Sequence, residues 1–307
     1  MNVDTTVKLG TLDLRTPLLT GSGTFGYGDE FKTVMDYSAL GGIVTKSISP
    51  RSRPGNPPPR ICETGGGGII NSIGLANPGV DGFLTDKVGC LPIGQTRVFL
   101  SVVGDSVEDF VTVVEKLESV AGVDGYEINV SCPNVRHGGL SLGGDKDAVK
   151  AIVSAVRSTT RRFVSVKLTP HHPAVEPMAE AAVKAGADAL TLTNTLIGMA
   201  IDVEKRKPLL GTVTGGYSGP PLKPVALAMV WRAAQAVDVP IWASGGIVNG
   251  LDGIEFLLAG ATCLQLGSVL FADPYAPGRV LREMEEYCLR HRVTKLTDLI
   301  GKLESRR

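Results

Sequence analysis

The sequence has no excess of charge of either sign. Its 31 basic residues balance its 31 acidic residues, which gives a formal net charge of zero. A surface without a dominant sign sets up no long-range field that would attract nucleic acid or an anionic membrane. We therefore expect a small molecule or another protein as the binding partner, and neither nucleic acid nor a membrane.

Cysteine is also scarce. The five cysteines are odd in number and form no C-x-x-C pair and no Cys/His cluster at zinc spacing. The first residues lack the apolar segment of a signal peptide and the arginine-rich pattern of a transit peptide. No apolar run reaches the roughly 18 residues needed to cross a bilayer. These absences predict a cytoplasmic protein in a reducing compartment.

The sequence does contain a repeated alternation of strand and helix. Hydrophobic residues make up 43% of the 307 residues, which is enough for a sizeable core. Apolar stripes at helical spacing occur at 107, 110, 111 and 114 and at 149, 152, 153 and 156, with Asp145 as the expected start of the second helix. Short apolar runs typical of strands lie at 18–20, 42–45, 98–103, 126–130, 164–168, 189–193, 241–244 and 263–266.

This order predicts a single (β/α)8 barrel domain of the α/β class over residues 1–307, because alternating strands and helices give a parallel sheet and this number of strands suits closure. Residues 7–14 alternate around Gly10 and predict a small amino-terminal β-hairpin that closes the floor of the barrel. Long loops rich in proline and glycine follow strand two (49–97) and strand six (196–220). Excursions of this length are usually functional.

Polar residues collect where the predicted strands end, and the carboxyl ends of barrel strands form the mouth at which chemistry occurs. Lys46 and Lys167 lie near the ends of strands two and five. A buried ammonium needs an anion or an electron-rich ring beside it, although either lysine could instead extend to solvent. A Gly-Gly pair at 245–246 and a Gly-Ser pair at 267–268 follow strands seven and eight, where such barrels bind phosphate. The pattern predicts a phosphorylated cofactor or substrate.

The exit of strand four carries the most informative run of the chain. The sequence from Glu127 to Asn134 delivers an asparagine, Asn129, and a thiol, Cys132, to a segment with nearby proline and glycine. A cysteine on such a loop is better interpreted as a reagent than as core filling. The other four cysteines are interpreted as buried or incidental thiols.

Three other motifs carry less weight. The run 21–26 matches G-x-G-x-x-G, but the next strand ends in Thr45-Lys46-Ser47, where a dinucleotide fold would place an acidic residue. The glycines at 65–68 lack the lysine of a P-loop. His171 and His172 have no acidic or cysteine partner at metal spacing, so we interpret them as loop residues and expect no metal site.

With these residues in hand, the chain resembles the class 1 dihydroorotate dehydrogenases, and most closely the class 1B catalytic subunit. The resemblance covers nearly the whole chain. It is carried by nine motifs in order, at 21–26, 45–47, 71–79, 129–134, 166–170, 194–195, 215–220, 244–246 and 266–268.

The resemblance implies a TIM barrel that binds FMN and oxidises (S)-dihydroorotate to orotate in pyrimidine biosynthesis. It implies FMN contacts from Ser22, Lys46, Ser47, Ser101, Asn129, Lys167, Thr193, Gly219, Gly245, Gly246, Gly267 and Ser268, the last four around the phosphate. It implies substrate contacts from Lys46, Asn71, Ser72, Ile73, Gly74, Leu75, Asn129, Asn194 and Thr195.

The resemblance also assigns roles and partners. Cys132 would be the general base that takes a proton from C5 of the substrate while hydride leaves C6 for the flavin. Class 1B enzymes pass electrons to NAD through a separate subunit that carries FAD and a 2Fe-2S cluster, and the resemblance implies a homodimer at the core of a heterotetramer. The cysteines of this chain lack the spacing to hold such a cluster alone.

Two positions depart from the family pattern. Ser101 stands where relatives often carry an asparagine facing the flavin, and Leu142 replaces a common aromatic residue. Alternative interpretations are a fumarate-dependent class 1A enzyme, a related flavin-dependent pyrimidine reductase, a Schiff-base aldolase that uses Lys167, and a barrel without activity. Cys132, Lys46 and several asparagines together favour an enzyme, because packing alone would not require them.

Overall fold

A closed barrel of eight parallel strands forms the centre of the molecule. The computed structural model describes residues 3–131, 136–137, 140–141, 144–172 and 174–304. The strands follow one another around the barrel in chain order, and the last pairs with the first. They are β3 (Leu18–Thr20), β4 (Gly42–Val44), β7 (Arg97–Val102), β8 (Gly125–Asn129), β11 (Phe163–Lys167), β12 (Ala189–Leu192), β17 (Ile241–Ser244) and β18 (Cys263–Leu266). The predicted (β/α)8 barrel is confirmed.

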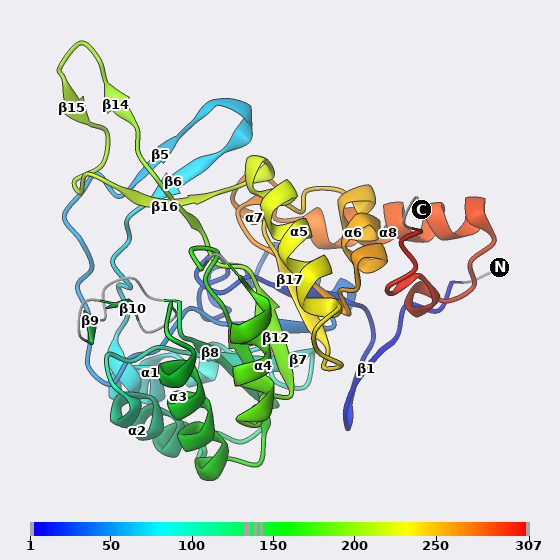
Figure 1. Ribbon diagram of the computed structural model, residues 1–307, viewed down its shortest axis with the longest axis horizontal. Coiled ribbons are helices and arrows are strands. Elements are labelled where there is room, and N and C mark those ends of the chain that lie inside the picture. Colours follow the sequence, from blue (N-terminus) through cyan, green and yellow to red (C-terminus); the bar gives the residue numbers. More distant parts are fainter. Residues whose placement is uncertain (1–2, 132–135, 138–139, 142–143, 173, 305–307) are drawn as a thin grey trace.

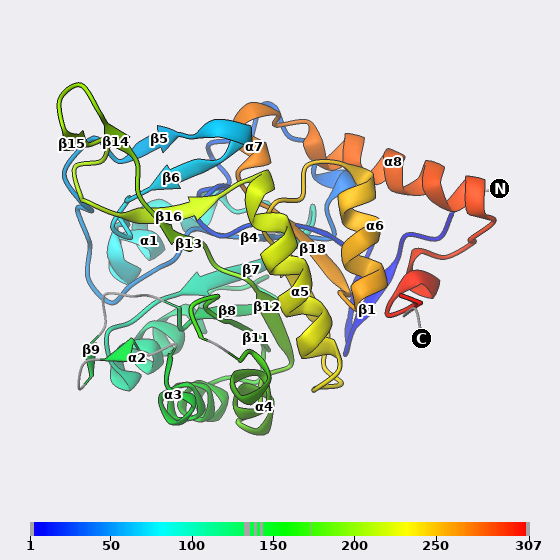
Figure 2. The same ribbon diagram turned by 45° about the horizontal axis from the view of Figure 1, so that its top comes forward.

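Helices surround the barrel, with α2, α3 and α4 side by side on one flank and α5, α6 and α8 on another (Figures 1 and 2). The helices are α1 (Gly79–Asp86), α2 (Val107–Leu117), α3 (Lys146–Thr159), α4 (Glu176–Lys184), α5 (Lys223–Ala234), α6 (Gly250–Ala259), α7 (Val269–Ala272) and α8 (Ala276–His291). Short 3-10 turns are η1 (Tyr37–Ala39), η2 (Gly65–Gly67), η3 (Val88–Cys90), η5 (Pro220–Leu222) and η6 (Leu296–Leu299). Within the described ranges, none of the helices combines the length and the apolar character needed to cross a membrane.

The start of α3 is confirmed as predicted. Asp145 is the N-cap, and its side chain accepts a hydrogen bond from the backbone N–H of Asp147 at 2.9 Å. All four residues of the predicted stripe are buried. The stripe predicted for α2 is partly wrong, because Val111 is only half-buried and Val113 is buried in its place. Since α2 packs against α3 as well as the barrel, its buried face is turned relative to the simple periodicity.

The amino-terminal hairpin closes one end of the barrel, as predicted. Its strands β1 (Val7–Leu9) and β2 (Leu12–Leu14) are antiparallel. Their buried side chains join one apolar cluster with residues from inside the barrel, where Phe99 and Trp242 meet edge to face at 4.9 Å. This end of the barrel is therefore filled, and the opposite end, where the strands finish, is left for chemistry.

The two long excursions pair with each other. Although 49–97 and 196–220 were predicted as loops, they form a four-stranded antiparallel sheet in the order β13-β16-β6-β5. The sheet and a projecting hairpin, β14 and β15, lie beyond the barrel strands in Figure 1. The strands are β5 (Ile61–Glu63), β6 (Ile69–Asn71), β13 (Leu196–Gly198), β14 (Ile201–Asp202), β15 (Lys207–Pro208) and β16 (Gly215–Ser218), and the pair β9 (Arg136–His137) and β10 (Leu140–Ser141) lies elsewhere.

Candidate active site

The mouth of the barrel brings together residues that are far apart in the sequence. Parallel strands end at one edge of the barrel, so the segments after β3, β4, β8, β11, β12, β17 and β18 all leave from the same side. Most of the predicted flavin and substrate residues lie on a barrel strand or on the segment directly after one. The 71–75 loop and Gly219 lie instead on the excursions.

Lys167 ends β11 and is 5% exposed. Its Nζ donates to Ser22 Oγ at 3.1 Å and to Gln265 Oε1 at 3.5 Å. Its closest carboxylate contact is Glu127 Oε1, at 3.7 Å. The structure thus brings together Lys167 and Ser22, two of the predicted flavin contacts, and adds a buried carboxylate, Glu127, that was not among the predicted site residues.

Glu127 lies inside the barrel and is fully buried. Its Oε2 accepts hydrogen bonds from Gln265 Nε2 at 2.6 Å and from Thr191 Oγ1 at 3.0 Å. Thr191 in turn shares a hydrogen bond of 2.9 Å with Ser165. Glu127 is two residues before Asn129 on the same strand, so period-two alternation would have placed both side chains on the interior face. That signal could have identified Glu127 from the sequence.

Asn129 and Asn194 meet across the mouth. Asn129 Oδ1 accepts from Ser131 Oγ at 2.7 Å and from Asn194 Nδ2 at 3.4 Å. Asn194 Nδ2 also donates to Ser131 Oγ at 2.6 Å, and Asn194 Oδ1 accepts from the backbone N–H of Thr195 at 2.8 Å. Three of the predicted substrate residues therefore form one hydrogen-bonded group.

The 71–75 loop leaves the sheet formed by the excursions. Asn71 Nδ2 donates to the carbonyl of Gly216 at 3.2 Å, and the backbone N–H of Ser72 donates to the carbonyl of Arg60 at 2.7 Å. Ser72 Oγ is buried without a hydrogen-bond partner in the described part of the chain. Ile73, Gly74 and Leu75 follow, the last two with left-handed φ values of 71° and 55°. Across the described residues, no hydrogen bond joins this loop to Lys46, Asn129 or Asn194.

Lys46 follows β4 and is half-buried. Its backbone N–H donates to the carbonyl of Gly26 at 2.8 Å, which ties the segment after β4 to the one after β3. Burial lowers the pKa of Lys46 below its usual value; Glu30 opposes that shift and Arg60 adds to it. Because burial disfavours the charged form of Lys46, an anion bound beside it at the mouth would stabilise the ammonium.

Ser47 and Ser101, two further predicted flavin contacts, lie side by side. Their hydroxyls share a hydrogen bond of 2.9 Å, and both side chains are buried. The backbone N–H of Ser101 donates to Thr45 Oγ1 at 3.2 Å. The serine at 101 is thus fixed by the segment after β4.

The Gly-Gly pair after β17 and the Gly-Ser pair after β18 differ in the space beside their backbones. Gly246 has a φ of 77°, and a Cβ there would lie 2.7 Å from the backbone nitrogen of Lys223. A Cβ at Gly267, by contrast, would meet nothing within 4 Å, so the space in front of this backbone is open. Ser268 directly precedes α7, and Thr193 is held by its N–H to the carbonyl of Ser244 at 2.7 Å. Gly219, with a φ of 100°, lies beside Gly67.

Cys132, the predicted base, lies outside the described residues, directly after Ser131. Leu142 also lies outside them. Cys263 and Cys288 are buried, as predicted, and burial raises the pKa of both thiols. Cys62 and Cys90 are partly buried and free.

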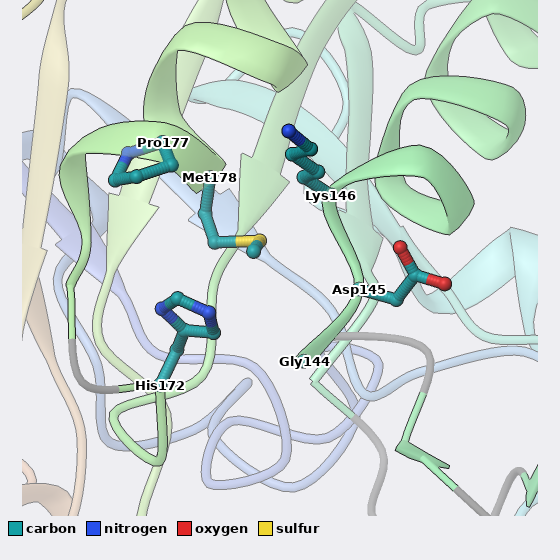
Figure 3. A pocket seen from close by; sticks show the side chains of 6 residues that line it. All are labelled: Gly144, Asp145, Lys146, His172, Pro177 and Met178. Atoms are coloured by element: carbon teal, nitrogen blue, oxygen red, sulfur yellow. The ribbon is translucent and has the colours of Figure 1, made fainter.

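A pocket of about 400 Å³ lies between the starts of α3 and α4. Figure 3 shows His172, Pro177 and Met178 on one side of it and Asp145 and Lys146 on the other. His172 Nδ1 is close to the carbonyl of Ala174. In the part of the chain that the structure describes, no group of three or more histidine, cysteine or acidic residues is arranged to hold a metal ion.

The family model described as Dihydroorotate dehydrogenase matches residues 5–288. Together with the closed barrel, this match defines the protein as a barrel oxidoreductase. The chain therefore belongs to the dihydroorotate dehydrogenase family, whose members are flavin-dependent.

Curated relatives match over nearly their full length. The chain is 46% identical over 301 residues to a protein from Citrifermentans bemidjiense and to one from Geobacter sulfurreducens, with 98% of each chain covered. It is 45% identical over 304 residues to a protein from Pelobacter propionicus, with 99% of this chain and 100% of the relative covered. All three are named "Dihydroorotate dehydrogenase B (NAD(+)), catalytic subunit".

Proposed function

We propose that this protein oxidises (S)-dihydroorotate to orotate in pyrimidine biosynthesis, with FMN as the hydride acceptor, in a single domain spanning residues 1–307. The observation that carries the proposal is the identity of 46% over 98% of the chain to relatives named for this activity. The family assignment favours this oxidoreductase over the Schiff-base aldolase.

The residues at the mouth fit FMN. The open space at Gly267 and the close packing at Gly246 suit a phosphate that approaches the backbone, so we assign the phosphate to Gly245, Gly246, Gly267 and Ser268. The buried ammonium of Lys167 faces the mouth and suits an electron-rich ring. The ring would also contact Ser22, Lys46, Ser47, Ser101, Asn129, Thr193 and Gly219.

The substrate is an anion with amide groups, and the mouth offers a cation and amides. Lys46 would attract the carboxylate, and the linked group of Asn129, Asn194 and Thr195 would hydrogen-bond the ring. The 71–75 loop, comprising Asn71, Ser72, Ile73, Gly74 and Leu75, would cover the substrate from the side of the excursions. This division leaves the opposite face of the ring for the cofactor.

Cys132 would supply the base. It comes three residues after Asn129, so a thiolate there would be near the substrate that Asn129 holds. Its role would be to take the proton from C5. FMN, when bound, accepts the hydride from C6.

The printed names of the relatives include "NAD(+)" and "catalytic subunit". We therefore assign the electrons from FMN to NAD, through a separate subunit that carries FAD and a 2Fe-2S cluster. This chain would form a homodimer at the core of a heterotetramer. Fumarate as direct acceptor, as in class 1A, is the alternative that the acceptor test below separates.

The test is anaerobic titration of the purified protein. A flavin band at about 450 nm should bleach on addition of dihydroorotate, and orotate should accumulate in equal amount. Reoxidation by NAD should require the partner subunit, and fumarate should leave the flavin reduced. A protein that binds no FMN, or whose flavin stays oxidised in excess dihydroorotate, would contradict the proposal.

A further inference from the structure

The barrel interior contains an ion pair directly below the mouth. Among the residues that the structure describes, three charged side chains are buried: Glu127, Lys167 and Asp252. Asp252 lies on α6 and pairs with Lys223 at 2.6 Å. Glu127 and Lys167 lie on β8 and β11, which are neighbouring barrel strands.

Burial of Glu127 is costly unless its charge is compensated. An ionised carboxylate inside a protein needs hydrogen bonds or an opposite charge. Its Oε2 accepts from Gln265 and Thr191, but Oε1 has no hydrogen-bond partner in the described residues. The ammonium of Lys167, 3.7 Å from Oε1, is its compensation.

Polar side chains inside the barrel form one layer around Glu127. The side chains around Glu127 that donate or accept hydrogen bonds are Thr191, Ser165, Gln265 and Lys167. The next group toward the hairpin is apolar and aromatic, with Phe163 stacked on Trp242 at 5.8 Å. Apolar side chains could fill the polar layer at no desolvation cost, so stability alone gives no reason for it.

We infer that Glu127 is a positioning residue for Lys167. Its carboxylate, held by Gln265 and Thr191, attracts the ammonium from below and fixes it against Ser22, at the place where the flavin ring would lie. This inference rests on the proposed function, in which the ring of FMN lies beside Lys167. The family assignment contains no role for Glu127.

The positioning has a consequence for the cofactor. A fixed ammonium beside the ring stabilises the negative charge that arrives with the electrons, and its stabilisation is greatest when no reorganisation is needed. If Glu127 acts through Lys167, removal of its charge should resemble removal of Lys167. If it acted directly through its own negative charge, its removal should have the opposite effect on the reduction potential.

The test uses Glu127→Gln, which keeps the shape, Lys167→Met, and the double variant. We expect E127Q to weaken FMN binding about tenfold and to lower the flavin reduction potential, in the same direction as K167M. In the K167M background, E127Q should change neither quantity further. The measurements are FMN titration of the apoprotein by fluorescence and equilibrium redox titration of the loaded protein.

Thr191→Val supplies a second variant if E127Q does not fold. It removes one donor to Glu127 at nearly constant volume, so it should shift both quantities in the same direction by a smaller factor. Glu176→Gln is the matched control, since this carboxylate pairs with Arg232 on the outer helices at 2.7 Å. It should change neither quantity.

A raised potential in E127Q, an unchanged FMN affinity, or an equal effect of E127Q with and without Lys167 would each overturn the inference. Failure of the proposed function gives a different result. In that case the unmodified protein itself would not bind FMN or would not be reduced by dihydroorotate.

Discussion

At the scale of single residues, the candidate site contains two lysines with different surroundings. Lys167 is buried and pairs with the carboxylate of Glu127. Lys46 is half-buried, and its pKa is affected by the charges of Glu30 and Arg60. The two lysines are therefore suited to different tasks. Lys167 can stay fixed beside a cofactor, and Lys46 can respond to an arriving anion.

Cys132→Ala tests the proposed base. Without the thiol, reduction of the flavin by dihydroorotate should be roughly 100-fold slower at neutral pH, because the C5 proton has no acceptor. FMN content should stay the same. Anaerobic stopped-flow absorbance measures the rate, and unchanged reduction kinetics would remove the role from Cys132.

The lowered pKa of Lys46 predicts a pH dependence of anion binding. Burial favours the neutral amine, so a rise in pH removes the positive charge before the usual lysine pKa of 10.5 is reached. Orotate binding should therefore be strongest below the lowered pKa and weaken above it, by up to about tenfold per pH unit.

Isothermal titration of the holoenzyme with orotate across alkaline pH measures this effect. Lys46→Arg keeps its charge to higher pH and provides the comparison. Its affinity should begin to fall at a higher pH than that of the unmodified protein. Coincident pH profiles for the two proteins would exclude Lys46 as the titrating group.

At the scale of elements, the glycines after β17 and β18 differ in what surrounds them. Gly246 is conformationally required, with a positive φ and a neighbour at 2.7 Å from a Cβ. Gly267 has no such constraint from the protein. Packing of the protein would therefore tolerate a side chain at Gly267, whereas the proposed phosphate contact would not.

Gly267→Ala separates the two explanations. The stability of the apoprotein should change by less than about 0.5 kcal/mol, since the added methyl group meets nothing within 4 Å. FMN binding should weaken by about tenfold or more, because the phosphate loses its close approach to the backbone.

Riboflavin, which lacks the phosphate, is the control ligand for Gly267→Ala. Its affinity should be equal in the variant and the unmodified protein. Urea unfolding and flavin fluorescence titration provide the measurements. Equal loss of FMN and riboflavin affinity would place the phosphate elsewhere.

Much of the barrel was predictable because the signals are local. Each strand is a short apolar run, and α3 begins at a side chain, Asp145, that caps its own helix. Glu127 was not predicted as a site residue because it lies inside its strand and not at the end, although its alternation with Asn129 indicates the interior face. The face of α2 was partly misjudged, since a neighbouring helix also determines which residues it buries.

At the scale of the whole molecule, the excursions form a sheet that no local pattern indicated. Asn71 and Gly216 are 145 residues apart and are hydrogen-bonded. Pairing of this kind depends on where the barrel places the two excursions relative to each other, and the periodicity of apolar residues does not encode that placement. Its result is a link between the 71–75 loop and the segment after β12, which carries Asn194 and Thr195.

Gly216→Ala tests this link. A Cβ at Gly216 would overlap the hydroxyl of Thr195, so the Thr195 side chain would have to shift away from β16 while Asn71 stays bonded to β16. The KM for dihydroorotate should rise roughly tenfold, as expected for local overpacking beside the substrate residues. FMN content and the rate of flavin reduction at saturating substrate should be nearly unchanged, because the proposed cofactor contacts other than Gly219 lie on the barrel strands or on the segments that directly follow them.

Gly65→Ala is the control for this prediction, since it lies in the turn of the same sheet and a Cβ there meets nothing within 4 Å. Its KM should equal that of the unmodified protein. Steady-state kinetics and the flavin-to-protein ratio distinguish the outcomes. If Gly216→Ala lowered FMN content and left KM unchanged, the sheet would support the cofactor and not the substrate, and the division of the mouth between barrel and excursions would be wrong.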